Sequence, residues 1–172
     1  MVVIQDIMIF MPIKNPGLQE LKNPVHLLAL GFGAGCAPKL PGTAGTLVGV
    51  LLYLLLQHLP VLYYTGLLII LFIPGIWICG RTARALGVDD HPAIVYDEIV
   101  GYLVTMIMAP SGWPWIVSGF LLFRLFDIWK PWPIRWLDRK VTGGFGVMLD
   151  DLVAGLFALV ALQLIHQMVY SL

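Results

Sequence analysis

Residues 61–80 read VLYYTGLLIILFIPGIWICG, twenty residues without one charged side chain, and this stretch decides the class of fold. A helix of about 20 apolar residues is long enough to cross the hydrocarbon core of a bilayer. The rest of the chain has the same character, because 59% of its 172 residues are hydrophobic and only 12% are charged. An ordinary soluble protein has about 25% charged residues. The sequence therefore predicts an all-α integral membrane protein.

Further apolar runs flank this stretch, and proline and glycine mark their ends. Several of these runs are short for a full crossing, so we expect a compact bundle of four to five transmembrane helices. The predicted spans are residues 44–59, 61–80, 96–112, 113–129 and 152–170.

The N-terminal part of the chain does not fit this pattern. Residues 24–37 are apolar but too short and too rich in glycine to cross, so they are expected to be re-entrant or to lie at the membrane interface. Residues 1–22 are expected to form an interfacial or disordered leader. Residues 23–172 then form a single membrane-embedded domain.

Basic residues are distributed unequally over the connections between the predicted spans. They occur before the first span, after the second and after the fourth, whereas the connections at 59–62 and 110–114 carry no charge. Because Lys and Arg in short loops are retained on the cytoplasmic side, the N-terminus is expected inside. Five crossings would place the C-terminus outside. The formal net charge is zero, so no nucleic-acid partner is expected.

Most of the acidic residues fall on that same cytoplasmic face, at ends of predicted spans or in the loops next to them. An ionised carboxylate beside an apolar helix end is costly unless it is paired or bound to metal. Helix caps, or an ion pair between Arg124 and Asp127, could explain individual cases. The acids on this face are Asp89, Asp90, Asp97, Glu98, Asp127, Asp138, Asp150 and Asp151.

Three helix ends that supply carboxylate oxygens together provide the hard ligands that Mg²⁺ prefers. We therefore expect a catalytic site with one or two Mg²⁺ ions on the cytoplasmic face. Asp150 and Asp151 are placed at the start of the last span, after a glycine-rich turn. The expected catalytic and metal-binding residues are Asp97, Glu98, Asp127, Asp150 and Asp151.

A phosphate group would need cations and free N–H groups near those acids. The segment GFGAGCAPKLPGTAGT, residues 31–46, offers glycines and a helix start, which together form an anion-binding nest. Arg124, Asp127 and Lys130 recur at intervals of three and share one helix face. The expected phosphate-binding residues are Arg124, Lys130, Lys39, Thr43 and Thr46. Asp138 and His91 are possible supporting groups, although solvation in a loop is the preferred interpretation of His91.

Familiar phosphatase motifs are absent from the sequence. Cys79 lacks an arginine at the spacing Cys-x5-Arg, so thiolate catalysis is not expected, and there is no Asp-x-Asp-x-Thr or Asp-x-Asp-x-Val box. Five other blocks occur instead. They are NPVHLLALGFGAG at 23–35, PGTAGT at 41–46, YDEIVG at 96–101, FRLFDIWKPWPIRW at 123–136 and GGFGVMLDDLVAG at 143–155.

In content and order these blocks resemble the phosphatidylglycerophosphatase A family. The resemblance implies a multi-pass enzyme of the bacterial inner membrane, with its site on the cytoplasmic face. It also implies Mg²⁺-dependent hydrolysis of phosphatidylglycerophosphate to phosphatidylglycerol and phosphate, with that substrate and bilayer lipid as partners.

A small cation- or proton-coupled carrier is the alternative, since it too would use acidic residues in a membrane. A carrier predicts acids spread through the depth of the bilayer, whereas these acids gather at one face. A non-enzymatic assembly subunit would leave the clustered acids replaceable.

Overall fold

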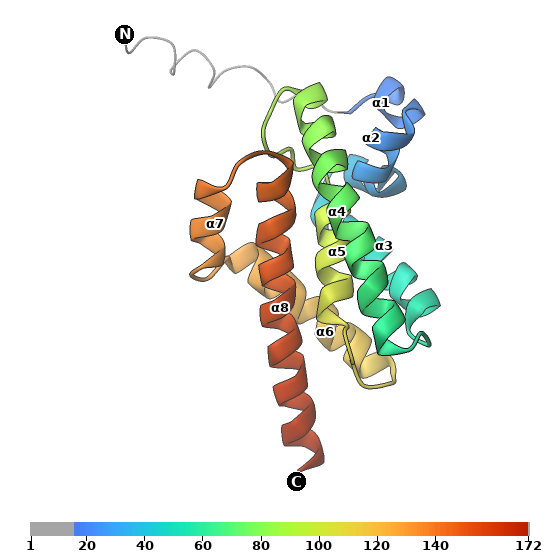
Figure 1. Cartoon of the computed structure of the whole chain (residues 1–172), viewed down its shortest axis with the longest axis vertical. Helices are drawn as coiled ribbons and strands as arrows, with labels where there is room; N and C mark the ends of the chain where they lie inside the picture. The colour runs from blue at the N-terminus through green and yellow to red at the C-terminus, as the bar shows by residue number, and fades with distance from the viewer. Residues whose placement is uncertain (1–15, 172) are drawn as a thin grey trace.

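The computed structural model describes residues 16–171, and these fold into helices joined by short loops, without strands (Figure 1). The all-α class is thus confirmed for the described residues. Residues 1–15 of the expected leader lie outside them. The elements are α1 (Leu18–Lys22), α2 (Pro24–Ala29), a 3-10 helix η2 (Gly31–Cys36), α3 (Pro41–Leu56), α4 (Val61–Leu86), α5 (Tyr96–Thr105), α6 (Trp113–Trp129), α7 (Ile134–Lys140) and α8 (Gly143–Tyr170).

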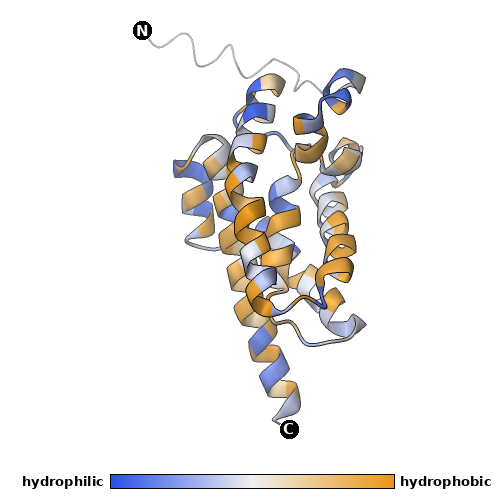
Figure 2. Cartoon of the chain, turned by 45° about the vertical axis from the view of Figure 1, so that its right-hand side comes forward, coloured by the Kyte–Doolittle hydropathy of each residue, from blue (hydrophilic) through white to orange (hydrophobic). Residues whose placement is uncertain are grey.

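Two helices, α4 and α8, are long and apolar enough to cross a membrane. They contain 26 and 28 residues, which correspond to about 39 and 42 Å, more than the ~30 Å of a bilayer core. On α4 the side chains of Ile69, Ile70 and Ile73 are all more than half exposed. Figure 2 shows hydrophobic colour along most of the long helices, and hydrophilic colour near the end of the bundle where α1 lies and on the last turns of α8. These surfaces fit a membrane protein.

The short helix α5 lies at the centre of the bundle. It packs against α3, α4, α6 and α8, and nine of its ten residues are buried. The expected span over 96–112 is wrong in its length, because the helix ends at Thr105 and Met108 adopts a left-handed backbone with φ 54° before Pro110. At about 15 Å, α5 is too short to cross a bilayer core as a helix.

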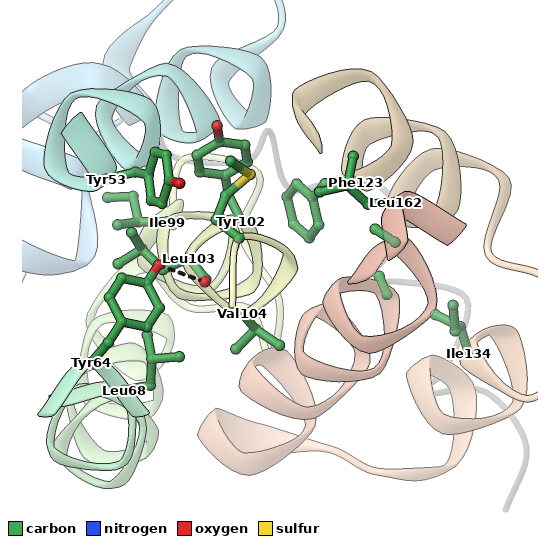
Figure 3. Packing of buried hydrophobic residues seen from close by; sticks show 13 residues of the cluster. Tyr53, Tyr64, Leu68, Ile99, Tyr102, Leu103, Val104, Phe123, Ile134 and Leu162 are labelled. Carbon is green, nitrogen blue, oxygen red and sulfur yellow. Dashed lines mark hydrogen bonds between the residues drawn. The ribbon is translucent and has the colours of Figure 1, made fainter. Parts of the chain in front are cut away.

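Aromatic packing holds α3, α4 and α5 together (Figure 3). The Tyr53 ring meets the rings of Tyr64 and Tyr102 edge-on, each at 6.4 Å between centroids. The Tyr64 hydroxyl donates to the Leu103 carbonyl oxygen at 2.8 Å, which satisfies the polar end of a buried tyrosine. This layer fixes α5 relative to the helices on one side of the bundle.

Glycine contacts bring α8 against α5 on the other side. A Cβ atom on Gly155 would overlap with the Gly101 carbonyl oxygen, and one on Gly101 would lie 2.8 Å from the Asp151 carbonyl oxygen. Small residues allow such close approach of helix backbones within membranes. Asp97 and Asp151 each precede one of these glycines by four residues, about one helical turn. The contact therefore sets the distance between the two acids.

The start of α8 also differs from the expectation. Gly143 and Gly144 were predicted to form a turn before a span at 152–170, but α8 begins at Gly143. A Cβ atom on Gly144 would overlap with the Ile76 carbonyl oxygen of α4, so this glycine serves helix packing. Asp150 and Asp151 consequently lie two turns inside the helix rather than at its start. The helix dipole acts mainly within the first turn, so these acids are not caps.

The Gly101–Gly155 contact predicts the effect of an added methyl group. Gly155→Ala should lower the free energy of unfolding by about 1–3 kcal/mol, because the Cβ atom would overpack the α5–α8 contact. Thermal unfolding of the detergent-purified chain measures this change. Gly66→Ala in α4 is the matched control, since nothing lies within 4 Å of its Cβ position. It should be neutral or stabilising by about 0.5–1 kcal/mol; equal losses in both variants would contradict the packing argument.

Candidate active site

Three carboxyl groups from two helices meet inside the bundle. Asp97 and Glu98 lie in the first turn of α5, and Asp151 projects from α8. Each offers one oxygen, and these three oxygens lie within 4.8 Å of one another. Asp97 is 8% exposed and Asp151 is 3% exposed. Like charges so close together and so far from water repel strongly, so a positively charged partner would stabilise the ionised cluster.

Two atoms of this cluster are well suited to such a partner. Glu98 Oε2 and Asp151 Oδ2 are buried and have no hydrogen-bond partner within residues 16–171, although buried polar atoms are nearly always bonded. The backbone N–H of Glu98 donates to Asp97 Oδ1 at 3.1 Å, which helps to orient that carboxylate. Carboxylate oxygens in sets of this kind bind Mg²⁺ and Ca²⁺. The three residues could therefore hold a divalent cation.

Arg124 of α6 closes one side of the cluster. Its Nη1 atom lies 2.5 Å from Asp127 Oδ2 and 3.8 Å from Glu98 Oε1. Asp127 is also close enough to Asp151 for their negative charges to repel each other. The Arg124 Nε atom is buried and unpartnered among the described residues. Arg124 thus balances part of the negative charge and keeps one donor available for an anion.

The start of α3 packs directly on Arg124. A Cβ atom on Gly42 would overlap with Glu98 Oε1 and lie 3.0 Å from Arg124 Nη1. The buried Thr46 hydroxyl donates to the Gly42 carbonyl oxygen at 2.8 Å and accepts from Arg124 Nη1 at 3.5 Å. No side chain caps the N-terminus of α3, and free N–H groups at a helix start favour anions. The predicted anion-binding segment therefore lies beside the acid cluster.

A second charged group surrounds Lys130, just beyond the end of α6. Its Nζ atom lies 2.6 Å from Asp150 Oδ2 and 2.6 Å from Asp138 Oδ1. Burial alone lowers the pKa of Lys130, but the charges and hydrogen bonds of Asp150 and Asp138 outweigh burial and raise this pKa above its usual value. Lys130 remains charged at neutral pH. The expected acids are thus divided between two groups, with Asp150 facing a lysine.

The other expected phosphate-binding and supporting residues lie nearby on the same side of the chain. Thr43 is half-buried in the first turn of α3, and Lys39 is exposed without an ion pair within residues 16–171. The expectation of a solvated His91 is wrong, because its side chain is 2% exposed and its Nδ1 atom accepts from the Ala93 N–H at 3.0 Å. The loop that carries it is pinned to α2, since the Val95 N–H donates to the Ala29 carbonyl oxygen at 2.9 Å.

Comparison with known proteins assigns the chain to a family. Residues 27–166 match the family described as Phosphatidylglycerophosphatase A. The chain belongs to the phosphatidylglycerophosphatase A family. A Phosphatidylglycerophosphatase A of Escherichia coli strain K12 is 44% identical over 140 residues, which cover 81% of this chain and 81% of the relative. One of Haemophilus influenzae strain Rd is 45% identical over 146 residues, covering 82% of this chain and 88% of the relative.

Membership of the phosphatidylglycerophosphatase A family identifies the chain as a phosphatase and confirms the resemblance seen in the five sequence blocks. A phosphatase of this family implies a lipid substrate. No solved structure gives a significant match to the chain.

Gly101 and Gly155 were not predicted as residues that build the candidate site. The sequence did contain a signal, because Asp97 and Gly101 repeat the spacing of Asp151 and Gly155. Two helices with an acid four residues before a glycine can meet at the glycines and bring the acids together. Gly42 was recognised only as part of a glycine-rich loop, and its contact with Glu98 and Arg124 depends on a helix far away in the sequence.

The ion pairs of Lys130 predict a loss of stability when the lysine is removed. Lys130→Met should lower the free energy of unfolding by about 2 kcal/mol, because it leaves the buried Asp150 without its counter-charge. Adding Asp150→Asn to this variant should restore part of the loss. Chemical unfolding in detergent measures both effects. Lys22→Met, at an exposed position on α1, is the control and should stay within about 0.5 kcal/mol of wild type; a loss as large as that of Lys130→Met would contradict this assignment.

Proposed function

We propose that this chain is a Mg²⁺-dependent phosphatase that removes the terminal phosphate of phosphatidylglycerophosphate and yields phosphatidylglycerol and inorganic phosphate. One observation carries the proposal: Asp97, Glu98 and Asp151 converge within 4.8 Å of one another and leave two buried oxygens unpartnered. The names of the relatives from Escherichia coli and Haemophilus influenzae support the substrate.

The donor set fits a magnesium ion. Asp97, Glu98 and Asp151 are the proposed ligands, with Asp127 next to them and Asp150 behind them on α8. All of these donors are hard carboxylate oxygens, which Mg²⁺ prefers over nitrogen or sulfur. When bound, Mg²⁺ would supply positive charge for the phosphoryl oxygens in the transition state.

The residues around the acids have the charge and position to hold a phosphate. Arg124 offers its unpartnered Nε beside the first turn of α3, where backbone N–H groups and Thr43 are available for phosphate oxygens. We assign Thr46 to positioning, since its hydroxyl is already bonded to Gly42 and Arg124. Lys39 lies on the exposed approach to α3 and is assigned to early capture of the headgroup.

Lys130 and its neighbours support the site from one side. Because Lys130 is already paired with Asp138 and Asp150, we assign it to keeping Asp150 ionised beside Asp151 rather than to binding phosphate directly. His91 is assigned to holding the loop before α5, through its bond with the Ala93 N–H.

In the reaction a water oxygen bonds to the terminal phosphorus, and the bond from phosphorus to the glycerol oxygen breaks. The glycerol oxygen takes up a proton to replace the one that the attacking water gives up.

We further propose a multi-pass arrangement in the bacterial inner membrane with the site on the cytoplasmic side. The chain runs back and forth along the bundle in α3, α4, α5, α6 and α8 (Figure 1), and residues 23–172 act as one membrane-embedded domain. Because α5 alone is too short to cross, the loop at 106–112 would complete that pass. The loops at 57–60 and 106–112 contain no Lys or Arg, whereas α7 and the end of α4 are basic. The positive-inside rule then places the C-terminus outside and α2 with η2 at the cytoplasmic interface.

The alternative of a cation- or proton-coupled carrier has no support. Its acids would line a path through the depth of the bundle. In this chain Asp97, Glu98 and Asp151 form one compact cluster instead of a path. The relatives are also named as phosphatases.

Phosphate release from phosphatidylglycerophosphate tests the proposed reaction. Asp97→Asn and Asp151→Asn should each lower kcat by about 100-fold or more, above the 10–100-fold loss typical of groups behind a ligand. Chelation of Mg²⁺ should abolish release by the wild-type chain. Asp89→Asn, at an exposed position on the loop before α5, is the control and should keep full activity. Full activity of Asp97→Asn, or release that survives the chelator, would refute the proposal.

Magnesium should also stabilise the folded chain, independently of turnover. At a free concentration 100 times its Kd, a ligand that binds only the folded state adds about 2.7 kcal/mol, so the wild-type Tm should rise with Mg²⁺. In Asp151→Asn the response should be lost, while the Tm without metal should be higher than in wild type because charge repulsion is relieved. An unchanged wild-type Tm at saturating Mg²⁺ contradicts a metal site in the cluster.

A further inference from the structure

A groove on the outward side of α6 extends to Arg124, which lies beside the acid cluster. It has a volume of about 840 Å³ and is lined by Leu121, Arg124, Leu125, Ile128, Trp129 and Arg135. Leu121, Leu125 and Ile128 are 60%, 52% and 69% exposed. Exposed leucine and isoleucine side chains on a membrane helix face lipid chains rather than water. We call this feature the α6 groove.

The inner end of the α6 groove is Arg124, which is also a wall of the candidate active site. The Arg124 guanidinium is paired with Asp127 and lies 3.8 Å from Glu98. A molecule in the groove that reaches Arg124 is therefore separated from Glu98 and Asp127 only by the Arg124 guanidinium. The groove connects the hydrocarbon surface of α6 to the place proposed for chemistry.

The outer end of the groove is positively charged. Arg135 and Trp129 also line an adjoining hollow of about 530 Å³, which contains Trp132, Arg139 and Lys140. The Arg135 Nη2 atom donates to the Trp129 carbonyl oxygen at 3.2 Å, which holds the side chain at this junction. Arg135 is exposed and forms no ion pair with another described residue. Within residues 16–171 its N–H donors have no acidic partner, so no described residue compensates its positive charge.

We propose that the α6 groove is the lateral entry and binding site for one diacyl phospholipid substrate, and that Arg135 binds the phosphodiester that links its glycerol units. The inference rests on the proposed function and adds how the lipid is recognised. One acyl chain lies against Leu121, Leu125 and Ile128, while the terminal phosphate reaches Arg124 and the acids.

Charge and polarity favour this occupant over others. The lipid has an apolar tail, an internal phosphodiester and a terminal phosphate, and the groove presents an apolar floor, Arg135 and Arg124. Arginine matches phosphate oxygens with two parallel hydrogen bonds. Tryptophan at the junction suits the boundary between headgroup and hydrocarbon. A lipid with only a terminal phosphomonoester would leave Arg135 without its anion.

Two lipids separate the role of Arg135 from the chemistry itself. Phosphatidylglycerophosphate contains the phosphodiester, whereas phosphatidic acid has a phosphomonoester and no phosphodiester. The full-length wild-type chain should have the higher kcat/KM for phosphatidylglycerophosphate in mixed micelles. Arg135→Gln should reduce this preference by about tenfold or more, the effect of losing a charge-assisted hydrogen bond. Arg135→Lys keeps the charge but not the planar fork, so it should give an intermediate preference. This variant also tests the role of Arg135 if Arg135→Gln fails to fold.

Arg84→Gln is the matched control for charge. It removes one exposed cation from the last turn of α4, away from the groove, and should keep the wild-type preference. An unchanged preference in Arg135→Gln overturns the inference while leaving the proposed function intact. A wild-type chain that releases phosphate from neither lipid contradicts the proposed function itself.

A bulky side chain tests the apolar part of the α6 groove. Leu125→Trp should lower kcat/KM for both lipids by obstructing the acyl chain. Ile69→Trp, at an equally exposed position on α4, is the control and should change neither value. If Leu125→Trp alters the oligomeric state in detergent without affecting turnover of either lipid, the groove is a contact between copies of the chain, and the inference is wrong.

Discussion

The close contact of α5 and α8 at Gly101 and Gly155 is the constraint on which the site depends. Neither position has room for a Cβ atom, so the two helix backbones approach more closely than side chains would allow. One turn before the glycines, Asp97 and Asp151 are thereby brought together in the interior. A membrane gives little hydrophobic driving force for such contacts, and close packing of small residues takes its place. The same contact that stabilises the bundle therefore builds the acid cluster.

The position of α5 explains how a charged cluster persists among apolar helices. The helix is short, buried on all sides and held by the tyrosine layer of Tyr53, Tyr64 and Tyr102. Its first turn places Asp97 and Glu98 below the surface of the bundle, where an unpaired carboxylate is costly. Arg124 offsets part of this cost, and two oxygens remain for a cation. A divalent cation bound to these oxygens would offset the remaining negative charge.

The sequence predicted the fold class correctly, but it predicted the ends of the helices less accurately. The all-α fold was predicted correctly from the composition, from the uncharged segment 61–80 and from the apolar segment 113–129. The span at 96–112 and the late start of the last helix were wrong, because apolar composition does not distinguish a lipid-facing helix from a buried one and because Gly143 and Gly144 read as a turn. The role of Gly144 in packing against α4 is visible only in three dimensions. The grouping of Asp97, Glu98 and Asp151 could be predicted as acids on one face, whereas the pairing of Asp150 with Lys130 could not, since it depends on the chain reversal before α7.

The central claim is that Asp97, Glu98 and Asp151 hold a divalent cation for hydrolysis of a lipid phosphate. Its most direct test is an experimental structure of the full chain with Mn²⁺ in place of Mg²⁺, with the metal located by anomalous scattering. We expect an anomalous-scattering peak for Mn²⁺ within ligand distance, about 2.0–2.3 Å, of oxygens from Asp97, Glu98 and Asp151. A peak coordinated by other residues, or none at these three acids at saturating Mn²⁺, would contradict it.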